Sequence, residues 1–142
     1  MLCERIMKDD VECVSPTDTV QAAARKMRDA NVGFLPVCDE TGKVLGTVTD
    51  RDLAVRVLAD GLGAETEISS VMTWEVIACR PEDDLRTAEH LMGKHRKSRM
   101  ICTDHAGRLM GVISLSDVVQ NDGSKLAAQT LRQVTDREAA RL

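Results

Sequence analysis

Apolar positions along the chain follow two periodicities, and each periodicity occurs again in the second half. The spacing of one helix face predicts an amphipathic helix at Val20, Ala23, Ala24, Met27 and Ala30. The same spacing returns at Leu85, Ala88, Leu91 and Met92. Short apolar runs bounded by turn residues predict paired strands at Phe34–Cys38 and Val44–Thr49, then at 100–103 and Leu109–Ser114.

Turn and cap residues separate these runs. The two hairpin turns end near Gly42 and Gly107, and glycine can adopt the positive φ that such turns require. Short strands are expected at 11–14 and 76–79. Asp18 and Asp83 are then placed to cap the amphipathic helices, because a short carboxylate accepts from free amides at a helix start.

A further helix is expected after Thr49 and after Ser114. Each half therefore reads strand, helix, strand, strand, helix, which predicts an α/β fold with one small sheet per half. Residues 122–142 have no counterpart in the first half, and their loosely helical spacing predicts an added C-terminal helix that packs on the module or on a partner.

The two halves match when the sequence is shifted by 65 positions without a gap. Met7 then falls on Met72, and Gly46 on Gly111. Two such units suggest β-α-β-β-α repeats related by a pseudo-twofold axis, with ligand clefts where the units meet. The expected division is a first repeat at 1–60, a linker at 61–70, a second repeat at 71–121 and a helical tail at 122–142.

Composition restricts the possible partners. The net charge is −4 and the pI about 5.4, which disfavours nucleic acid and anionic membranes. One Trp, one Phe and no Tyr leave almost nothing on which bases could stack. No apolar run approaches the length of a membrane span, and the N-terminus lacks a signal pattern, so we expect a cytoplasmic protein.

The five cysteines are an odd number and are widely spaced, without a Cys-x-x-Cys pair. Buried thiols in a reducing compartment are the simplest interpretation. A redox-sensing thiol is the alternative, and Cys3 is its best candidate because chain ends tend to be exposed. His90, His95 and His105 do not have the spacing of a metal site.

The junction between the third strand and last helix of each half carries the most specific motif. In both copies a glycine is followed three residues later by a hydroxyl residue, and three residues after that by an aspartate. These residues are Gly46, Thr49 and Asp52 in the first copy. They are Gly111, Ser114 and Asp117 in the second. A capping box alone would explain this spacing. A carboxylate in this place can also accept both hydroxyls of a ribose, while free amides at the helix start can meet phosphate.

The whole pattern resembles a tandem pair of cystathionine β-synthase (CBS) domains, also called a Bateman module. The strings VSPTDTVQAAARKM, VGFLPVCDETGKVLGTVTDRDL and SRMICTDHAGRLMGVISLSDVV carry the resemblance, which covers about residues 1–121. It implies a non-catalytic regulatory module that binds AMP, ADP, ATP or another adenosyl compound such as S-adenosylmethionine or NAD(H), and that requires no cofactor.

The resemblance also implies a set of ligand-binding residues. Asp52 and Asp117 would hold ribose hydroxyls, Thr49 and Ser114 would contact ribose or phosphate, and Ser116 would add a hydroxyl near phosphate. The early strands around Val14 and Cys79 would clasp adenine. Arg99 falls where some relatives place a phosphate-binding arginine, whereas Phe34 stands there in the first copy. The two sites are therefore not expected to be equivalent.

The only dense basic run, 94–99, is compatible with a solvated helix end, but Arg96 and Arg99 are candidates for polyphosphate. Arg51 and Arg56 could also reach a ligand. An RNA-binding role for this run is disfavoured by the acidic chain.

We expect a regulatory sensor of adenine nucleotides, acting through a regulated protein partner or through a homodimer built on the apolar helix faces. No nucleophile-base set, Walker loop or paired zinc motif indicates catalysis. A ligand-free scaffold whose junctions only cap helices is the alternative. A redox or metal sensor using Cys3 or the histidines is a third possibility.

Overall fold

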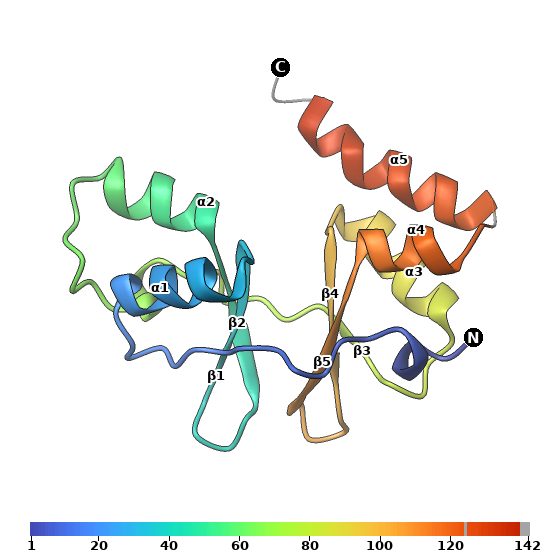
Figure 1. Cartoon of the computed structure of the whole chain (residues 1–142), viewed down its shortest axis with the longest axis horizontal. Helices are drawn as coiled ribbons and strands as arrows, with labels where there is room; N and C mark the ends of the chain where they lie inside the picture. Colours follow the sequence, from blue (N-terminus) through green and yellow to red (C-terminus); the bar gives the residue numbers. More distant parts are fainter. Residues whose placement is uncertain (124, 140–142) are drawn as a thin grey trace. The chain divides into compact units, whose positions relative to one another are not determined.

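The computed structural model describes residues 1–123 and 125–139. It divides into two compact units. The first-repeat unit is Val11–Val76, and the second-repeat unit combines Met1–Asp10 with Ile77–Leu142. The CBS-like α/β order expected from the sequence is present in both (Figure 1).

The first-repeat unit contains helices α1 Val20–Ala30, α2 Asp50–Asp52, η2 Leu53–Leu58 and η3 Ile68–Ser70, with strands β1 Phe34–Cys38 and β2 Val44–Thr49. The second-repeat unit contains helices η1 Cys3–Arg5, α3 Leu85–His95, α4 Leu115–Asn121 and α5 Lys125–Ala139, with strands β3 Ala78–Cys79, β4 Arg99–Thr103 and β5 Leu109–Ser114.

Both hairpins predicted from the sequence are confirmed. β1 and β2 pair antiparallel with Phe34 opposite Thr49, and β4 and β5 pair with Arg99 opposite Ser114. Gly42 and Gly107 have φ values of 88° and 80°, as the turns require. The two registers are equivalent under the shift of the repeat, so both junction motifs leave their hairpins in the same way.

The first strand of each repeat is shorter than predicted. Val14 makes only an isolated parallel bridge to Val37, and β3 has two residues paired parallel with β4. The paired residues are the last ones of each expected strand, and the residues before them make no ladder pair. The expected strands at 11–14 and 76–79 are therefore too long.

The expected helix caps were also wrong by one residue. Thr19 caps α1 by accepting from the Ala22 N–H, and Asp84 caps α3 by accepting from the Arg86 N–H. Asp18 and Asp83 instead accept the N–H of the residue three places earlier, Ser15 and Arg80, both at 2.9 Å. These carboxylates close the turn before the helix. A short acidic side chain can either cap a helix or close a turn.

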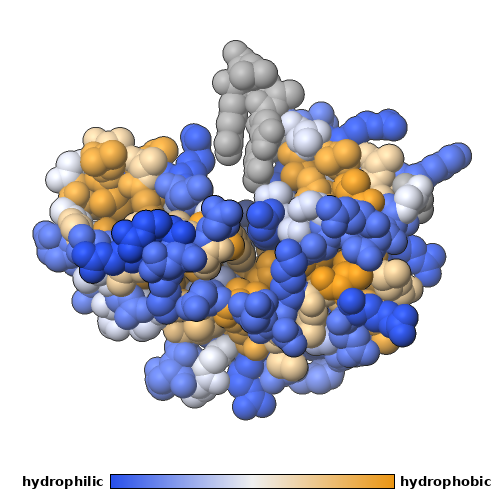
Figure 2. Space-filling view, viewed as in Figure 1, coloured by the Kyte–Doolittle hydropathy of each residue, from blue (hydrophilic) through white to orange (hydrophobic). Residues whose placement is uncertain are grey.

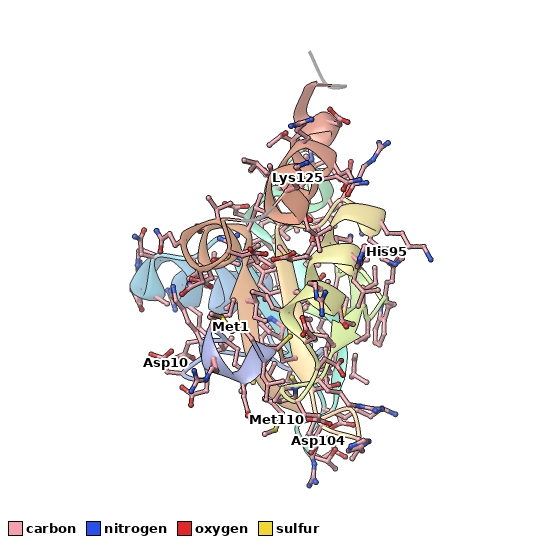
Figure 3. All side chains as sticks on the ribbon, turned by 90° about the vertical axis from the view of Figure 1, so that its right-hand side faces the viewer. Met1, Asp10, His95, Asp104, Met110 and Lys125 are labelled. Carbon is pink, nitrogen blue, oxygen red and sulfur yellow. The ribbon has the colours of Figure 1, made fainter. Side chains whose placement is uncertain are left out.

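The segment that precedes each repeat in the sequence belongs to the unit of the other repeat. We call Met1–Asp10 the N-terminal strap, and residues 66–75 the central strap. Cys3 donates its N–H to the Asp83 carbonyl, and Ile68 donates to the Asp18 carbonyl, which are equivalent contacts under the shift of 65. Figure 3 labels the two ends of the N-terminal strap, Met1 and Asp10.

Each strap continues with an antiparallel bridge to the last strand of its unit. Lys8 pairs with Val112, and Thr73 pairs with Thr47. Much of the stretch expected to be a linker, 61–70, belongs to this strap, and Ile68 is fully buried in the core of the first-repeat unit. The residues before a repeat are thus structural parts of the fold.

The cores are separate clusters of apolar side chains. α1 contributes Val20, Ala23 and Met27 to the first, whereas Ala24 and Ala30 of the predicted stripe are exposed. In the second-repeat unit, α3 contributes Leu85, Ala88 and Met92.

The C-terminal helix α5 packs on α3 and α4 of its own unit (Figure 1). Ala127, Thr130 and Val134 form its buried stripe, and the Thr130 hydroxyl donates to the Glu89 carbonyl at 3.3 Å. The end of the predicted tail, 140–142, lies outside the described residues. None of the described helices is long and apolar enough to cross a membrane.

Candidate functional site at the strand–helix junctions

The junction of the first repeat is a complete capping box. The Thr49 hydroxyl accepts from the Asp52 N–H at 3.1 Å, and Asp52 Oδ2 accepts from the Thr49 N–H at 2.9 Å. The Asp52 side chain is 15% exposed. Its second oxygen, Oδ1, lies 3.8 Å from Arg56 Nε. The cap therefore occupies one carboxylate oxygen and leaves the other available for a ligand.

The second-repeat junction repeats this geometry. The Ser114 hydroxyl accepts from the Asp117 N–H at 3.1 Å, and Asp117 Oδ2 accepts from the Ser114 N–H at 2.9 Å. The Asp117 side chain is 14% exposed. The Ser116 hydroxyl lies 3.2 Å from that of Ser114. The capping prediction is confirmed in both repeats, and it is compatible with a ligand role because only Oδ2 is used.

The cation beside each aspartate comes from a different element. In the first repeat it is Arg56, one turn further along the same helix, which also donates to the carbonyls of Val71 and Met72. In the second repeat it is Lys8 of the N-terminal strap, whose Nζ lies 3.7 Å from Asp117 Oδ1. Asn121 stands at the position equivalent to Arg56, and its amide donates to the Asp117 carbonyl.

The helix after the first junction is unusual. After Asp50–Asp52 it continues as a π-helix over Leu53–Leu58, with Ala59 donating its N–H to the Ala54 carbonyl. The equivalent helix α4 is a regular α-helix. π-helical segments are rare and occur frequently at functional sites. The wider turn gives the backbone after Asp52 a different path from the backbone after Asp117. The two junctions are therefore not equivalent.

The remaining predicted arginines lie on three different elements. Arg99 stands directly opposite Ser114 in the β4–β5 register, and its guanidinium donates to the Ser98 carbonyl at 3.1 Å. Arg96 ends α3 in the left-handed conformation with a φ of 55°, where the first repeat has Asn31. Arg51 is exposed in the first turn of α2.

The two residues predicted to lie near adenine are buried in their units. Val14 is 2% exposed, and its backbone exchanges hydrogen bonds with Pro36 and Cys38. Cys79 is 3% exposed, and its Sγ lies 3.5 Å from Cys102 Sγ and 3.9 Å from Cys3 Sγ. The Cys79 thiol belongs to the core of the second-repeat unit.

The expectation that Cys3 is exposed was wrong. Its side chain is fully buried because the N-terminal strap places it against Cys79. The hydrogen bond to Cys79, and then burial, raise the pKa of the Cys3 thiol far above its ordinary value. The neighbouring Cys102 and burial raise the pKa of Cys79 to about 12. Protonated, buried thiols are poor nucleophiles.

Other sites are less well formed. Among the described residues, no group of three or more His, Cys, Asp or Glu side chains is arranged to hold a metal ion. A pocket of about 340 Å³ lies at the far end of α4 from the junction, lined by Met1, Asp84, Leu85, Arg86, Asn121 and Asp122. It contains none of the site residues predicted from the sequence.

Sequence reasoning did not identify Lys8. The signal was present, since Met7 falls on Met72 and the period therefore includes the straps. It was not used because the contact of Lys8 with Asp117 joins residues 109 positions apart in the chain. Only the folded strap brings them together.

The model of the CBS domain family matches residues 3–59 and 68–123. This chain belongs to the CBS domain family. It is 37% identical over 122 residues to the CBS domain-containing protein YhcV of Bacillus subtilis, covering 86% of each chain. The two repeats account for most of the sequence.

Similar repeats also occur inside larger proteins. The chain is 32% identical over 117 residues to an inosine-5′-monophosphate dehydrogenase of Methanocaldococcus jannaschii, covering 82% of this chain and 23% of that one. The fold matches the CBS domain pair of protein MJ0100, in complex with 5′-methylthioadenosine and S-adenosyl-L-methionine, with a TM-score of 0.76 and 24% identity over 84% of this chain and 94% of that one.

Proposed function

We propose that this protein is a non-catalytic regulatory module that binds an adenosyl ligand at its strand–helix junctions. The observation that supports this best is the state of Asp52 and Asp117. In both repeats the capping box fixes the carboxylate through Oδ2, while Oδ1 lies 3.7–3.8 Å from a cation. A fixed carboxylate oxygen beside a cation suits a ribose diol attached to a phosphate or another charged group.

Family membership supports an adenosyl ligand, and a protein of the same fold was crystallised with two such compounds. AMP, ADP and ATP are the first candidates because the cations Lys8, Arg51, Arg96 and Arg99 suit phosphate. S-adenosylmethionine and NADH are the others. A thermal-shift series with these five compounds separates a sensor from a ligand-free scaffold. A ligand at 100 times its Kd adds about 2.7 kcal/mol to the free energy of unfolding.

Replacing Asp117 with alanine is expected to weaken nucleotide binding at the second repeat by roughly tenfold to a hundredfold. A hydrogen bond to a charged group contributes about 1.5–3 kcal/mol, which corresponds to that change. Isothermal titration with AMP measures it. Asp52→Ala tests the first repeat in the same way.

Asp83→Ala is the matched control, because Asp83 also accepts an N–H from three residues earlier at 2.9 Å but is not part of the junction. It loses the same type of backbone hydrogen bond and should keep its affinity. An Asp117→Ala protein that is folded and binds AMP with wild-type affinity would remove Asp117 from the site.

Regulation would act through a homodimer or a protein partner. The helix after the first junction exposes Val55 and Leu58, with Leu58 78% exposed, and Leu62 just beyond the helix is exposed as well. Figure 2 shows apolar surface over this helix, labelled α2 in Figure 1. Exposed apolar patches commonly mark protein interfaces. Ligand binding would then shift the population of states that the second copy or partner recognises.

Leu58→Lys is expected to shift the protein from dimer to monomer in sedimentation velocity, because a charge replaces an apolar side chain in the interface. Leu2→Lys is the control, since Leu2 is exposed on another element. Wild-type protein that sediments as a monomer at all concentrations would contradict the homodimer. So would a Leu58→Lys dimer as stable as the wild type.

A further inference from the structure

The two junctions have the same kinds of side chain in exchanged positions. After the hydroxyl residue, the first repeat has Arg51 where the second has Ser116. On the strap, the first repeat has Thr73 where the second has Lys8. Each junction therefore has one cation and one hydroxyl at these two positions. The cation comes from the helix in the first repeat and from the strap in the second.

The strap positions are equivalent in structure as well as in sequence. Lys8 and Val112 exchange both backbone hydrogen bonds at 2.9 Å, and Thr73 and Thr47 exchange theirs at 2.9 and 3.0 Å. The backbone of Lys8 is therefore fixed on β5, next to the junction. Its side chain is 69% exposed, and its ion pair with Asp117 is long at 3.7 Å. Such an exposed pair contributes little free energy, so a ligand can recruit the ammonium at low cost.

We propose that Lys8 supplies the phosphate-binding cation of the second-repeat site, in place of the arginine that the first repeat has at position 51. The inference rests on the proposed binding of an adenosyl ligand. It explains why the second-repeat site would prefer a ligand that carries a phosphate. With the diol on Asp117, the Lys8 ammonium contacts both the carboxylate and the 5′-phosphate, and Ser116 adds a hydroxyl. The second site thus prefers a nucleotide to a nucleoside because of a residue of the N-terminal strap.

The test compares AMP with adenosine, since the two differ only in the phosphate. It uses the full chain with Asp52→Ala, which removes the diol acceptor of the first repeat. Titration should give a lower Kd for AMP than for adenosine. Adding Lys8→Thr should reduce this preference about threefold to tenfold, with the Kd of adenosine within about twofold of its former value.

A double variant that exchanges the cation and the hydroxyl between these two positions provides the decisive test. Lys8→Thr with Ser116→Arg gives the second repeat the arrangement of the first, and it should recover the preference for AMP. Lys43→Thr, which removes an exposed lysine of the β1–β2 turn, should leave the preference unchanged and so controls for net charge.

Two results with Lys8→Thr would overturn the inference while the proposed function stands. One is an unchanged preference for AMP in Lys8→Thr. The other is an equal loss of AMP and adenosine binding, which would mean that Lys8 only holds the strap in place. Failure of the exchanged variant to regain the preference would likewise count against the inference. If the wild-type protein binds neither these two compounds nor any other compound of the thermal-shift series, the proposed function itself is wrong.

Discussion

Replacing Gly46 with alanine is expected to reduce the free energy of unfolding of the first-repeat unit by about 3 kcal/mol. A Cβ at this position would overlap the carbonyl oxygen of Thr73 and lie 2.7 Å from the terminal methyl of Met72. The Thr73 carbonyl belongs to the central strap and accepts the Thr47 N–H at 3.0 Å. The added methyl group can be accommodated only if the strap moves away and this bridge is lost.

Urea unfolding monitored by circular dichroism measures this effect. Alanine substitutions at two other glycines provide the comparison. Gly111→Ala would place a Cβ 2.7 Å from the Lys8 carbonyl, so its loss should be smaller but clear. Gly123→Ala has no atom within 4 Å of the new Cβ and should have little effect. A Gly46→Ala midpoint equal to that of Gly123→Ala would show that close approach of the strap does not explain this glycine.

A pH-dependent loss of stability is expected from the buried carboxyl group of Glu89. Glu89 is 0% exposed on α3, and neither of its carboxylate oxygens has a hydrogen-bond partner among the described residues. Burial, followed by the neighbouring Asp122 at the end of α4, raises the pKa of Glu89 from near 4.5 to about 8. Asp84 on α3 acts in the same direction, and Arg86 opposes it.

The direction of the effect follows from the two pKa values. The folded protein keeps the Glu89 proton up to about pH 8, whereas the unfolded chain loses it near pH 4.5. The stability that this proton provides is fully present below pH 4.5 and is lost as the pH rises to 8. The loss should be on the order of 4 kcal/mol across this range.

Glu89→Gln should remove this pH dependence and make the protein more stable than the wild type at pH 8.5. Glu4→Gln, at an exposed position of η1, is the control and should keep the wild-type profile. Urea midpoints from pH 5 to 8.5 provide the comparison. Parallel profiles for Glu89→Gln and the wild type would mean that Glu89 is ionised throughout this range in the folded protein.

Residues close in sequence were predicted well because local interactions determine them. The hairpins follow from apolar runs around turns with Gly42 and Gly107, and both capping boxes follow from a hydroxyl and an aspartate three residues apart. The helix caps before α1 and α3 were misplaced by one residue. Two polar residues compete there, and the backbone geometry of the turn decides which of them caps the helix.

The straps could not be derived in this way. Cys3 was expected to be exposed because it lies near a chain end, but a strap whose partner strand is distant in sequence buries it. Gly46 was recognised as part of a motif, yet its physical reason, the approach of Thr73, is a contact of the folded unit. Glu89 lay on a predicted helix, but its burial depends on the tertiary structure, in which α5 packs on α3.

By itself the sequence determined the repeated α/β order, the two hairpins, the capped junctions and the family to which the chain belongs. These features are encoded by short spacings and by a period that needs no folded structure to be seen. The tertiary structure decided which cation lies beside each aspartate, which thiols are accessible and which glycine tolerates no side chain. Each of these depends on backbone segments far apart in the chain that come together only when hydrogen bonds fix the straps.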